Sequence, residues 1–128
     1  MILLIGGAHQ GKLDYAKETF GITDADVYAC GSGEVDFSKR CICKIEEFAL
    51  HHPDPVRYFT ESWEAWQDSI LIIRDIFCGV VPINAEDRAW RQRAGRLAQY
   101  LSREATQVSR IFCGTYFSIY MQYTWPEP

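Results

Sequence analysis

A short apolar run at the start of the chain leads directly into a glycine-rich loop, and this junction constrains the fold more than any other feature. The run is Ile2-Leu3-Leu4-Ile5, and the loop is Gly6-Gly7-Ala8-His9-Gln10-Gly11-Lys12. A strand buried on both faces has such a continuous apolar sequence, and strands of this kind belong to parallel sheets. Apolar residues at helical spacing follow over residues 12–20, and Gly21 is a stop signal. Strand, glycine turn and helix in this order predict the start of an α/β domain.

The loop matches G-x-x-x-x-G-K and lies between a predicted strand and a predicted helix, which is the context that the motif requires. Glycines allow consecutive backbone N–H groups to surround phosphate oxygens, and the N-terminal end of the helix adds its dipole. We therefore predict that a nucleotide or phosphate binds here, with a purely structural turn as the alternative. The predicted binding residues are Gly6, Gly7, Ala8, His9, Gln10, Gly11 and Lys12.

The position after Lys12 departs from the motif. It normally holds Ser or Thr, whose hydroxyl binds Mg²⁺, and here it is Leu13. Either the metal is held by phosphates, waters and acids elsewhere, or metal-dependent chemistry is weakened. Asp14 is a poor substitute, because its side chain points about 100° further round the helix.

The rest of the chain alternates between predicted strands and predicted helices. We predict strands over 26–30, 69–73 and 108–113 and helices over 39–51, 56–67 and 86–105, with Asn84 capping the last helix. With the first strand, this order predicts a single domain over residues 1–128, built on a small, mostly parallel sheet with helices on both faces. So small a sheet favours self-association that covers its edges, and we expect a homo-oligomer.

Charge is spread unevenly over the chain, although the formal net charge is only −4. Residues 86–110 hold six arginines against three acids, and the remainder is acidic. This argues against a nucleic-acid partner, because no broad basic surface is available for duplex DNA. A local anion site near the arginines is one interpretation of the basic stretch, and a solvated helix face is the other.

Neither a membrane segment nor a disulfide framework is indicated. No apolar run approaches the roughly 20 residues that span a bilayer, and Met1–Ile5 is too short for a signal-peptide core. We expect a cytoplasmic protein with no membrane partner. The five cysteines lack the spacing of a zinc site and are expected to be reduced, while His51-His52 is expected to lie at a helix end.

Asp75 and the residues after it carry a likeness to a known family. Asp75 follows a predicted buried strand, which is where an acid lies beside Mg²⁺ in phosphoryl-transfer sites. Further along are Gly79-Val80-Val81-Pro82, then Arg88, Arg91, Gly95 and Arg96, then a strand that ends at Gly114. Together with the glycine loop, these residues resemble the adenosylcobinamide kinase / adenosylcobinamide-phosphate guanylyltransferase family of cobalamin biosynthesis, particularly its short members. The likeness covers roughly residues 1–20 and 70–114.

The resemblance implies a P-loop NTPase-like fold and a nucleotide-dependent kinase. Proteins of this family phosphorylate the side-chain hydroxyl of adenosylcobinamide with a nucleoside triphosphate, and then transfer GMP from GTP through a guanylylated histidine. The implied cofactors are ATP or GTP and Mg²⁺, and the implied substrate is a corrinoid. Carried over to this chain, Gly6, Gly11 and Lys12 would hold phosphates, Lys12 and Asp75 would be catalytic, and Asp75 would support the metal. Arg88 and Arg91 would neutralise anionic oxygens.

Three positions depart from the family pattern. Leu13 lacks the metal-binding hydroxyl, Glu46 lies where the guanylylated histidine is expected, and Tyr120 replaces a closing lysine. The expected function is therefore phosphorylation of adenosylcobinamide, and these departures argue against guanylyl transfer. One alternative is a catalytically degenerate relative that binds a nucleotide or a corrinoid, and another is an assembly partner with the aromatic tail 116–125 as its interface.

Overall fold

A computed structural model of the chain describes residues 1–7, 11–76, 84–112 and 115–121, the last strand by its backbone. The strands are β1 (Ile2–Gly6), β2 (Val27–Ala29), β3 (Cys41–Cys43), β4 (Ile70–Arg74), β5 (Gln107–Phe112) and β6 (Thr115–Met121). The helices are α1 (Lys12–Phe20), α2 (Ile45–His51), α3 (Pro55–Glu61), α4 (Trp63–Trp66) and α5 (Ala85–Glu104), and a single 3₁₀ turn covers Asp24–Asp26.

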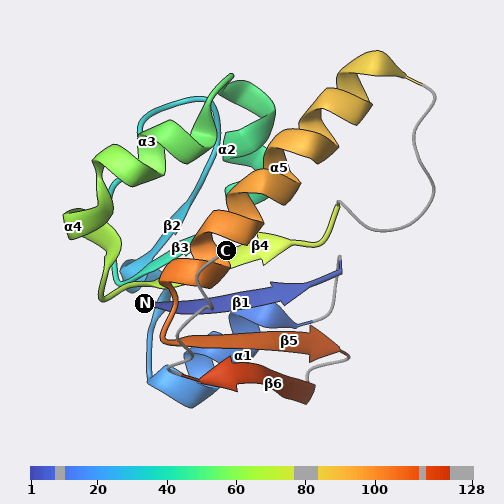
Figure 1. Cartoon of the computed structure of the whole chain (residues 1–128). Helices are drawn as coiled ribbons and strands as arrows, with labels where there is room; N and C mark the ends of the chain where they lie inside the picture. Colours follow the sequence, from blue (N-terminus) through green and yellow to red (C-terminus); the bar gives the residue numbers. More distant parts are fainter. Residues whose placement is uncertain (8–10, 77–83, 113–114, 122–128) are drawn as a thin grey trace.

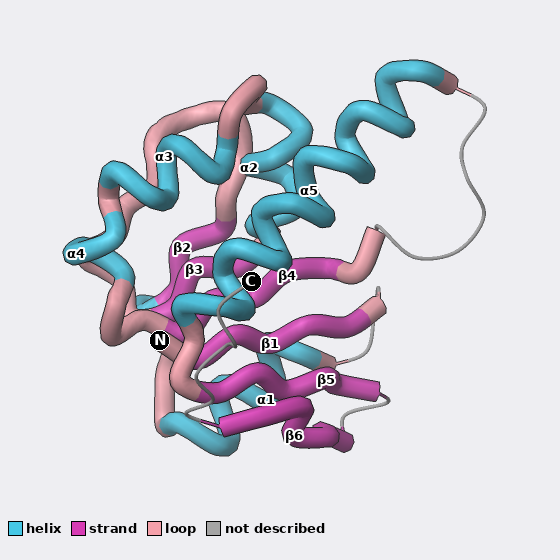
Figure 2. Tube along the Cα trace, viewed as in Figure 1, coloured by secondary structure: helices cyan, strands magenta, loops and turns pink. Residues whose placement is uncertain are grey.

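The strands form one sheet in the order β2-β3-β4-β1-β5-β6 (Figures 1 and 2). The first five strands in this order are parallel to their neighbours, and β6 runs antiparallel to β5 at the edge. β1 lies between β4 and β5 and pairs with both along most of its length, with Ile2 opposite Ile70 on one side and Gln107 on the other. The predicted α/β class and the mostly parallel sheet are therefore confirmed.

Helices cover both faces of this sheet, as predicted. α2, α3 and α5 lie over one face, which we call the α5 face, and α1 lies over the opposite α1 face (Figure 1). Successive side chains of a strand point to opposite faces, so Leu3 and Ile5 contribute to the α5-face core and Leu4 contributes to the α1-face core. This double burial explains the continuous apolar run of β1.

The long helix α5 follows its predicted pattern closely. Ala94, Leu97 and Leu101 are fully buried along the predicted stripe. Asn84 caps the helix, because its Oδ1 accepts hydrogen bonds from the backbone N–H groups of Glu86 and Asp87 at 2.7 and 3.3 Å. Such a cap satisfies donors that have no partner within the helix.

Residues 39–51 form a strand and a short helix rather than the single predicted helix. β3 occupies Cys41–Cys43, and α2 begins only after Lys44, which has a left-handed backbone with φ 56°. Cys41, Ile42 and Cys43 are all buried in the sheet. A short apolar run satisfies a helical and a strand pattern equally well, and here pairing with β2 and β4 decides for the strand.

The aromatic tail supplies a strand that the sequence analysis does not predict. Two residues separate the end of β5 from the start of β6, and Phe112 pairs with Thr115 across the connection. The run Thr115-Tyr-Phe-Ser-Ile-Tyr is rich in β-branched and aromatic residues, which favour strands, and a two-residue connection is typical of a hairpin. Within the described residues the sheet therefore has six strands rather than four.

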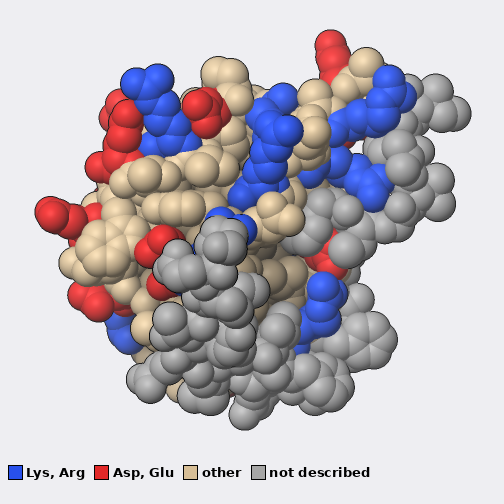
Figure 3. Space-filling model, in the orientation of Figure 1, with Lys and Arg blue, Asp and Glu red and all other residues tan. Residues whose placement is uncertain are grey.

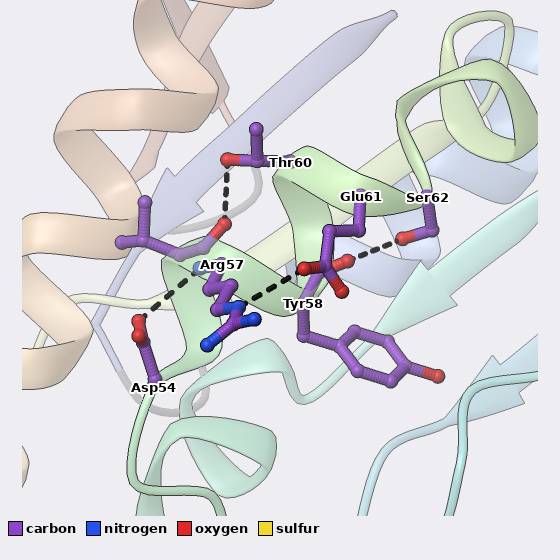
Figure 4. Close-up of polar contacts among 7 residues, drawn as sticks. Asp54, Arg57, Tyr58, Thr60, Glu61 and Ser62 are labelled. Carbon is purple, nitrogen blue, oxygen red and sulfur yellow. Dashed lines mark hydrogen bonds and ion pairs between the residues drawn. The ribbon is translucent and has the colours of Figure 1, made fainter.

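The predicted helix over 56–67 is divided at Ser62 into α3 and α4. The Ser62 hydroxyl donates to the carbonyl oxygen of Tyr58 at 2.7 Å, and Asp54 caps the start of α3 by accepting from the N–H of Arg57 (Figure 4). Trp66 is fully buried and donates from its indole to the carbonyl oxygen of Phe59 at 2.9 Å. Phe59 and Trp66 thus belong to the core, whereas Trp63 is exposed.

Among the described helices, none combines the length and the apolar composition needed to cross a bilayer. β2 and β6 are the two edge strands of the sheet. The expected covering of these edges by a second copy of the chain remains a prediction.

Candidate functional site

The glycine-rich loop joins the carboxyl end of the central strand to the first helix. β1 ends at Gly6 and α1 begins at Lys12, so the motif lies where it was predicted. Gly11 precedes the helix with φ 80° and ψ 26°, a left-handed conformation that glycine adopts without strain. Ala8, His9 and Gln10, which the motif also assigns to the site, lie outside the described residues.

Gly6 is held between the two neighbouring strands. A Cβ atom at this position would lie 2.6 Å from the carbonyl oxygen of Ile111 on β5, so only glycine fits without a shift of the backbone. On the other side, the Gly6 carbonyl oxygen accepts a hydrogen bond from the N–H of Asp75 at 2.8 Å. The start of the loop is therefore fixed to the ends of both β4 and β5.

The loop and Asp75 lie at a switch point of the sheet topology. β1 and β4 are neighbours, yet the chain after β1 leads to α1 on one face and the chain after β4 leads to α5 on the other (Figure 1). In open parallel sheets, ligands bind outside the carboxyl ends of the strands at such a point, because the diverging connections leave a crevice. This topological argument is independent of the sequence motif and indicates the same place.

Lys12 is half-buried, and its ammonium group lies over the loop. Its Nζ donates to the carbonyl oxygen of Gly7 at 2.6 Å. Burial lowers the pKa of Lys12; the charge of Arg74 lowers it further, while the carboxylates of Glu46 and Asp75 partly offset the decrease. The sequence pairs Lys12 with Asp75 in one site, and the structure brings both residues to the same end of the sheet.

Asp75 is paired with an arginine from β5. Its Oδ2 accepts from the guanidinium of Arg110 at 2.9 Å, and its side chain is only 7% exposed. Its second oxygen, Oδ1, is buried and has no hydrogen-bond partner among the described residues. The sequence analysis counts Arg110 only as part of a basic stretch and gives it no place beside Asp75.

Glu46 is a further charged residue at this end of the sheet, and it is 5% exposed. Its Oε1 accepts from the backbone N–H of Arg74 at 2.8 Å, and its carbonyl oxygen accepts from the indole of Trp90 at 2.7 Å. Glu46 therefore connects α2, the end of β4 and α5. The sequence analysis notes this residue only as a departure from the family pattern, and no local signal links it to Lys12.

A cavity of about 480 Å³ opens beside Lys12, lined by the start of α1 and the start of α2. Its walls come from the start of α1, the junction of β3 with α2, and the end of β4. The lining residues are Gly11, Lys12, Leu13, Asp14, Cys43, Lys44, Glu46, Glu47, Ile72 and Arg74. A larger cavity of about 610 Å³ lies along α5 and includes Gly95 and Arg96 of the family pattern, but not Lys12 or Asp75. The smaller cavity therefore contains Lys12, Glu46 and Arg74 of the candidate site, but Asp75 and Arg110 do not line it.

Arg88 and Arg91 lie in the first half of α5, Arg88 exposed and Arg91 half-buried. The basic side chains of α5 are all arginines, and Figure 3 shows blue side chains spread over the region of this helix. Arg93, also in the basic stretch, donates to the carbonyl oxygens of Ala49 and Leu50 at the end of α2, at 2.8 and 3.3 Å. Phosphate contacts by Arg88 and Arg91 remain a prediction.

The described residues do not fit a magnesium ion held by the protein. Leu13 is half-buried and packs against the α1-face core, so it offers no oxygen at the motif position. One oxygen of Asp75 is already paired with Arg110. Over the described ranges, no three His, Cys, Asp or Glu side chains are grouped as metal ligands.

The contacts of His52 and the burial of the three described cysteines are typical of residues with a structural role. His51 ends α2, and the imidazole of His52 stacks on Phe48 with ring centroids 3.7 Å apart. Cys30, Cys41 and Cys43 are buried free thiols. Burial raises the pKa of Cys30 and Cys41 to about 12 and also raises that of Cys43, so these thiols stay protonated and unreactive at neutral pH. Cys78 and Cys113 lie outside the described residues.

Comparison with known proteins adds no assignment. No model of a known protein family matches the chain, and no curated protein matches its sequence.

Proposed function

We propose that this chain binds a nucleoside phosphate at the loop formed by residues 6–12. The observation that carries the proposal is the loop itself: it leaves the central strand at a topological switch point and leads into α1, with Lys12 over the loop. Backbone N–H groups, the N-terminal end of a helix and a lysine are the usual partners of phosphate oxygens.

The half-burial of Lys12 supports an anionic ligand, whereas the net charge around it does not. The cavity lining and the Asp75–Arg110 pair together hold four cations and four acids: Lys12, Lys44, Arg74 and Arg110 against Asp14, Glu46, Glu47 and Asp75. Lys12 is half-buried, so its ammonium ion has lost part of its hydration. A phosphate group would replace that hydration with charge-assisted hydrogen bonds.

We further propose that the bound nucleotide is ATP or GTP and that its terminal phosphoryl group is transferred to an alcohol. The resemblance described above supplies the acceptor, the side-chain hydroxyl of adenosylcobinamide. In such a transfer, the hydroxyl oxygen forms a bond to the γ-phosphorus, the bond from the γ-phosphorus to the bridging oxygen breaks, and the hydroxyl proton is released. Catalysis then depends on positioning and on cationic groups near the phosphates.

Isothermal titration with ATP and GTP tests the binding step. Lys12→Ala should weaken nucleotide binding by about 10- to 100-fold, since loss of a hydrogen bond to a charged group costs about 1.5–3 kcal/mol. Lys17→Ala is the matched control, because Lys17 lies on the same helix but pairs with Asp24. Absence of binding by the unaltered protein would contradict the proposal.

A second candidate function is a catalytically inactive relative that only binds a nucleotide or a corrinoid. The observation that favours it is Leu13, whose half-buried side chain packs in the α1-face core in place of a metal-binding hydroxyl. Incubation with cobinamide and ATP or GTP, followed by mass spectrometry, separates the two functions. A phosphorylated cobinamide supports the kinase, and nucleotide binding without product supports the binding module.

A further inference from the structure

The pairing of Asp75 with Arg110 bears on how the proposed site handles a metal ion. An acid at the end of a strand beside a phosphate loop ordinarily faces Mg²⁺. Here the Asp75 carboxylate already has a cationic partner, because its Oδ2 accepts from Arg110 Nη1 at 2.9 Å. Its Oδ1 is buried, and Mg²⁺ keeps several of its water molecules when it binds to proteins, so this oxygen offers little room to a hydrated ion.

The sheet fixes the backbone position of Arg110, although its side chain is 46% exposed. Arg110 lies opposite Ile5 in the pairing of β1 with β5, one residue before the point where Ile111 closely approaches Gly6. Asp75 is fixed in turn by its N–H, which donates to the Gly6 carbonyl oxygen. The backbone therefore holds the two charged residues on either side of the same loop residue.

A second observation also indicates that this site has lost a protein ligand for Mg²⁺. The motif position that supplies a metal-binding hydroxyl is Leu13, and its half-buried side chain belongs to the apolar packing of the α1 face. Both protein ligands that a phosphate loop offers to Mg²⁺ are thus altered: one is replaced by an apolar side chain, and the other is neutralised by a guanidinium group.

We infer that Arg110 takes the electrostatic role of a divalent cation beside Asp75, so that this chain binds a nucleoside phosphate without a metal ion. The inference rests on the proposed function, because it concerns the same loop and the same ligand. A guanidinium ion next to Asp75 keeps the carboxylate from repelling the phosphate oxygens. With Asp75 neutralised in this way, Lys12 supplies the positive charge around the nucleotide.

The first test is isothermal titration of the unaltered protein with ATP and with GTP, once in MgCl₂ and once in excess EDTA. The dissociation constants in the two buffers should agree within about threefold, which corresponds to less than about 0.7 kcal/mol. Binding that is lost in EDTA and restored by MgCl₂ overturns the inference and leaves the proposed function standing. Absence of binding in both buffers overturns the proposed function and the inference together.

The second test makes the site dependent on metal. In Arg110→Gln, Asp75 loses its cationic partner, so nucleotide binding in EDTA should weaken by about tenfold or more, the loss of one charge-assisted interaction. MgCl₂ should then recover most of this loss, because Asp75 is free to hold the ion. Equal binding by this variant and the unaltered protein in EDTA would contradict the inference.

Three further variants separate this role from a structural one. Arg110→Lys keeps the charge and should bind nucleotide equally in both buffers, and Asp75→Asn combined with Arg110→Gln should lose the recovery by MgCl₂. Arg57→Gln is the matched control, since Arg57 forms a 3.0 Å pair with Glu61 on α3, a helix that lines no part of the cavity beside Lys12 (Figure 4). If Arg110→Gln does not fold, as judged by circular dichroism, the comparison of buffers for the unaltered protein decides.

Discussion

Two arginine–carboxylate pairs of nearly equal length occur in very different regions of this molecule. Arg110 and Asp75 are 2.9 Å apart at the end of the central strands, and Arg57 and Glu61 are 3.0 Å apart on the surface of α3. Asp75 is 7% exposed, whereas Glu61 is 66% exposed. The two pairs therefore differ chiefly in the burial of the carboxylate, because the Arg110 side chain is itself 46% exposed and both partners of the α3 pair lie in solvent.

The difference teaches what burial does to a polar contact. An exposed pair four residues apart on a helix exchanges solvent contacts for protein contacts at little net gain. A buried carboxylate or backbone group that loses its protein partner cannot form a hydrogen bond to water in its place. Loss of the partner therefore lowers the stability of the fold. The variants below compare positions at the strand ends with chemically similar positions in solvent.

The largest contrast is expected between two glycines. Gly6→Ala places a Cβ atom 2.6 Å from the Ile111 carbonyl oxygen and forces the backbone to move, so unfolding free energy should fall by about 1–3 kcal/mol. Gly31→Ala is the control, because nothing lies within 4 Å of its added Cβ, and it should be neutral or slightly stabilising. Urea denaturation measures both, and equal stabilities would show that β5 does not constrain Gly6.

A comparable contrast is expected between two glutamates. Glu46→Ala leaves the half-buried N–H of Arg74 without its acceptor, and the unfolding free energy should fall by about 1–3 kcal/mol. Glu61→Ala removes the same side chain from an exposed helix position and should change the stability very little. Thermal unfolding followed by circular dichroism distinguishes these results. A loss no larger at Glu46 than at Glu61 would rule out the bridging role of Glu46.

A smaller effect of opposite sign is expected at Lys44. This residue adopts a left-handed backbone with φ 56° at the start of α2, a conformation that is unfavourable for residues with a side chain. Lys44→Gly should therefore stabilise the fold by about 1 kcal/mol. Lys44→Ala shortens the side chain without relieving the strain, and it should not stabilise in the same urea titration. Equal behaviour of the two variants would refute the strain.

The smallest effect is expected from pH, and it contrasts two lysines of α1. Burial lowers the pKa of Lys12, whereas the hydrogen bond to Asp24 raises the pKa of Lys17. A bound phosphate favours the charged lysine, so nucleotide affinity should decrease as pH rises through the lowered pKa of Lys12, at a lower pH than for an ordinary lysine. Without ligand, the pH dependence of folding stability has the opposite sign. Folding disfavours the charged form of Lys12, so the contribution of Lys12 to folding stability increases as pH rises from its folded pKa towards the ordinary value.

Titration calorimetry at several pH values measures the first of these slopes. Lys12→Ala should remove the pH dependence, while Lys17→Ala should leave it unchanged. A dependence that persists in Lys12→Ala would assign it to another group.

Much of this fold could be predicted from local sequence patterns. β1, the glycine turn, α1, β4 and α5 all lie within a residue or two of their predicted bounds. Each of these elements has a complete signal within its own length, either a continuous apolar run or an apolar stripe with a cap or a stop. The position of the candidate site was predictable for the same reason, because the loop motif is continuous in sequence.

Other parts were decided by contacts that no local window contains. Cys41–Cys43 became a strand because β2 and β4 pair with it, and the tail became β6 because it folds back on β5. A three-residue strand has too few residues to show a period of its own. Its assignment therefore depends on neighbours that are distant in sequence.

By itself the sequence determined an α/β domain with a glycine loop and Lys12 at the end of its first strand. Only the tertiary structure decided which charges surround that lysine, because Glu46 and Arg110 are separated from Lys12 by intervening strands and helices. The parallel sheet brings the carboxyl ends of β4 and β5 to either side of Gly6, and the start of α2 beside them. The physical reason is that apolar periodicity specifies where a chain is buried, whereas the partner of a buried charge is set by strand order and register.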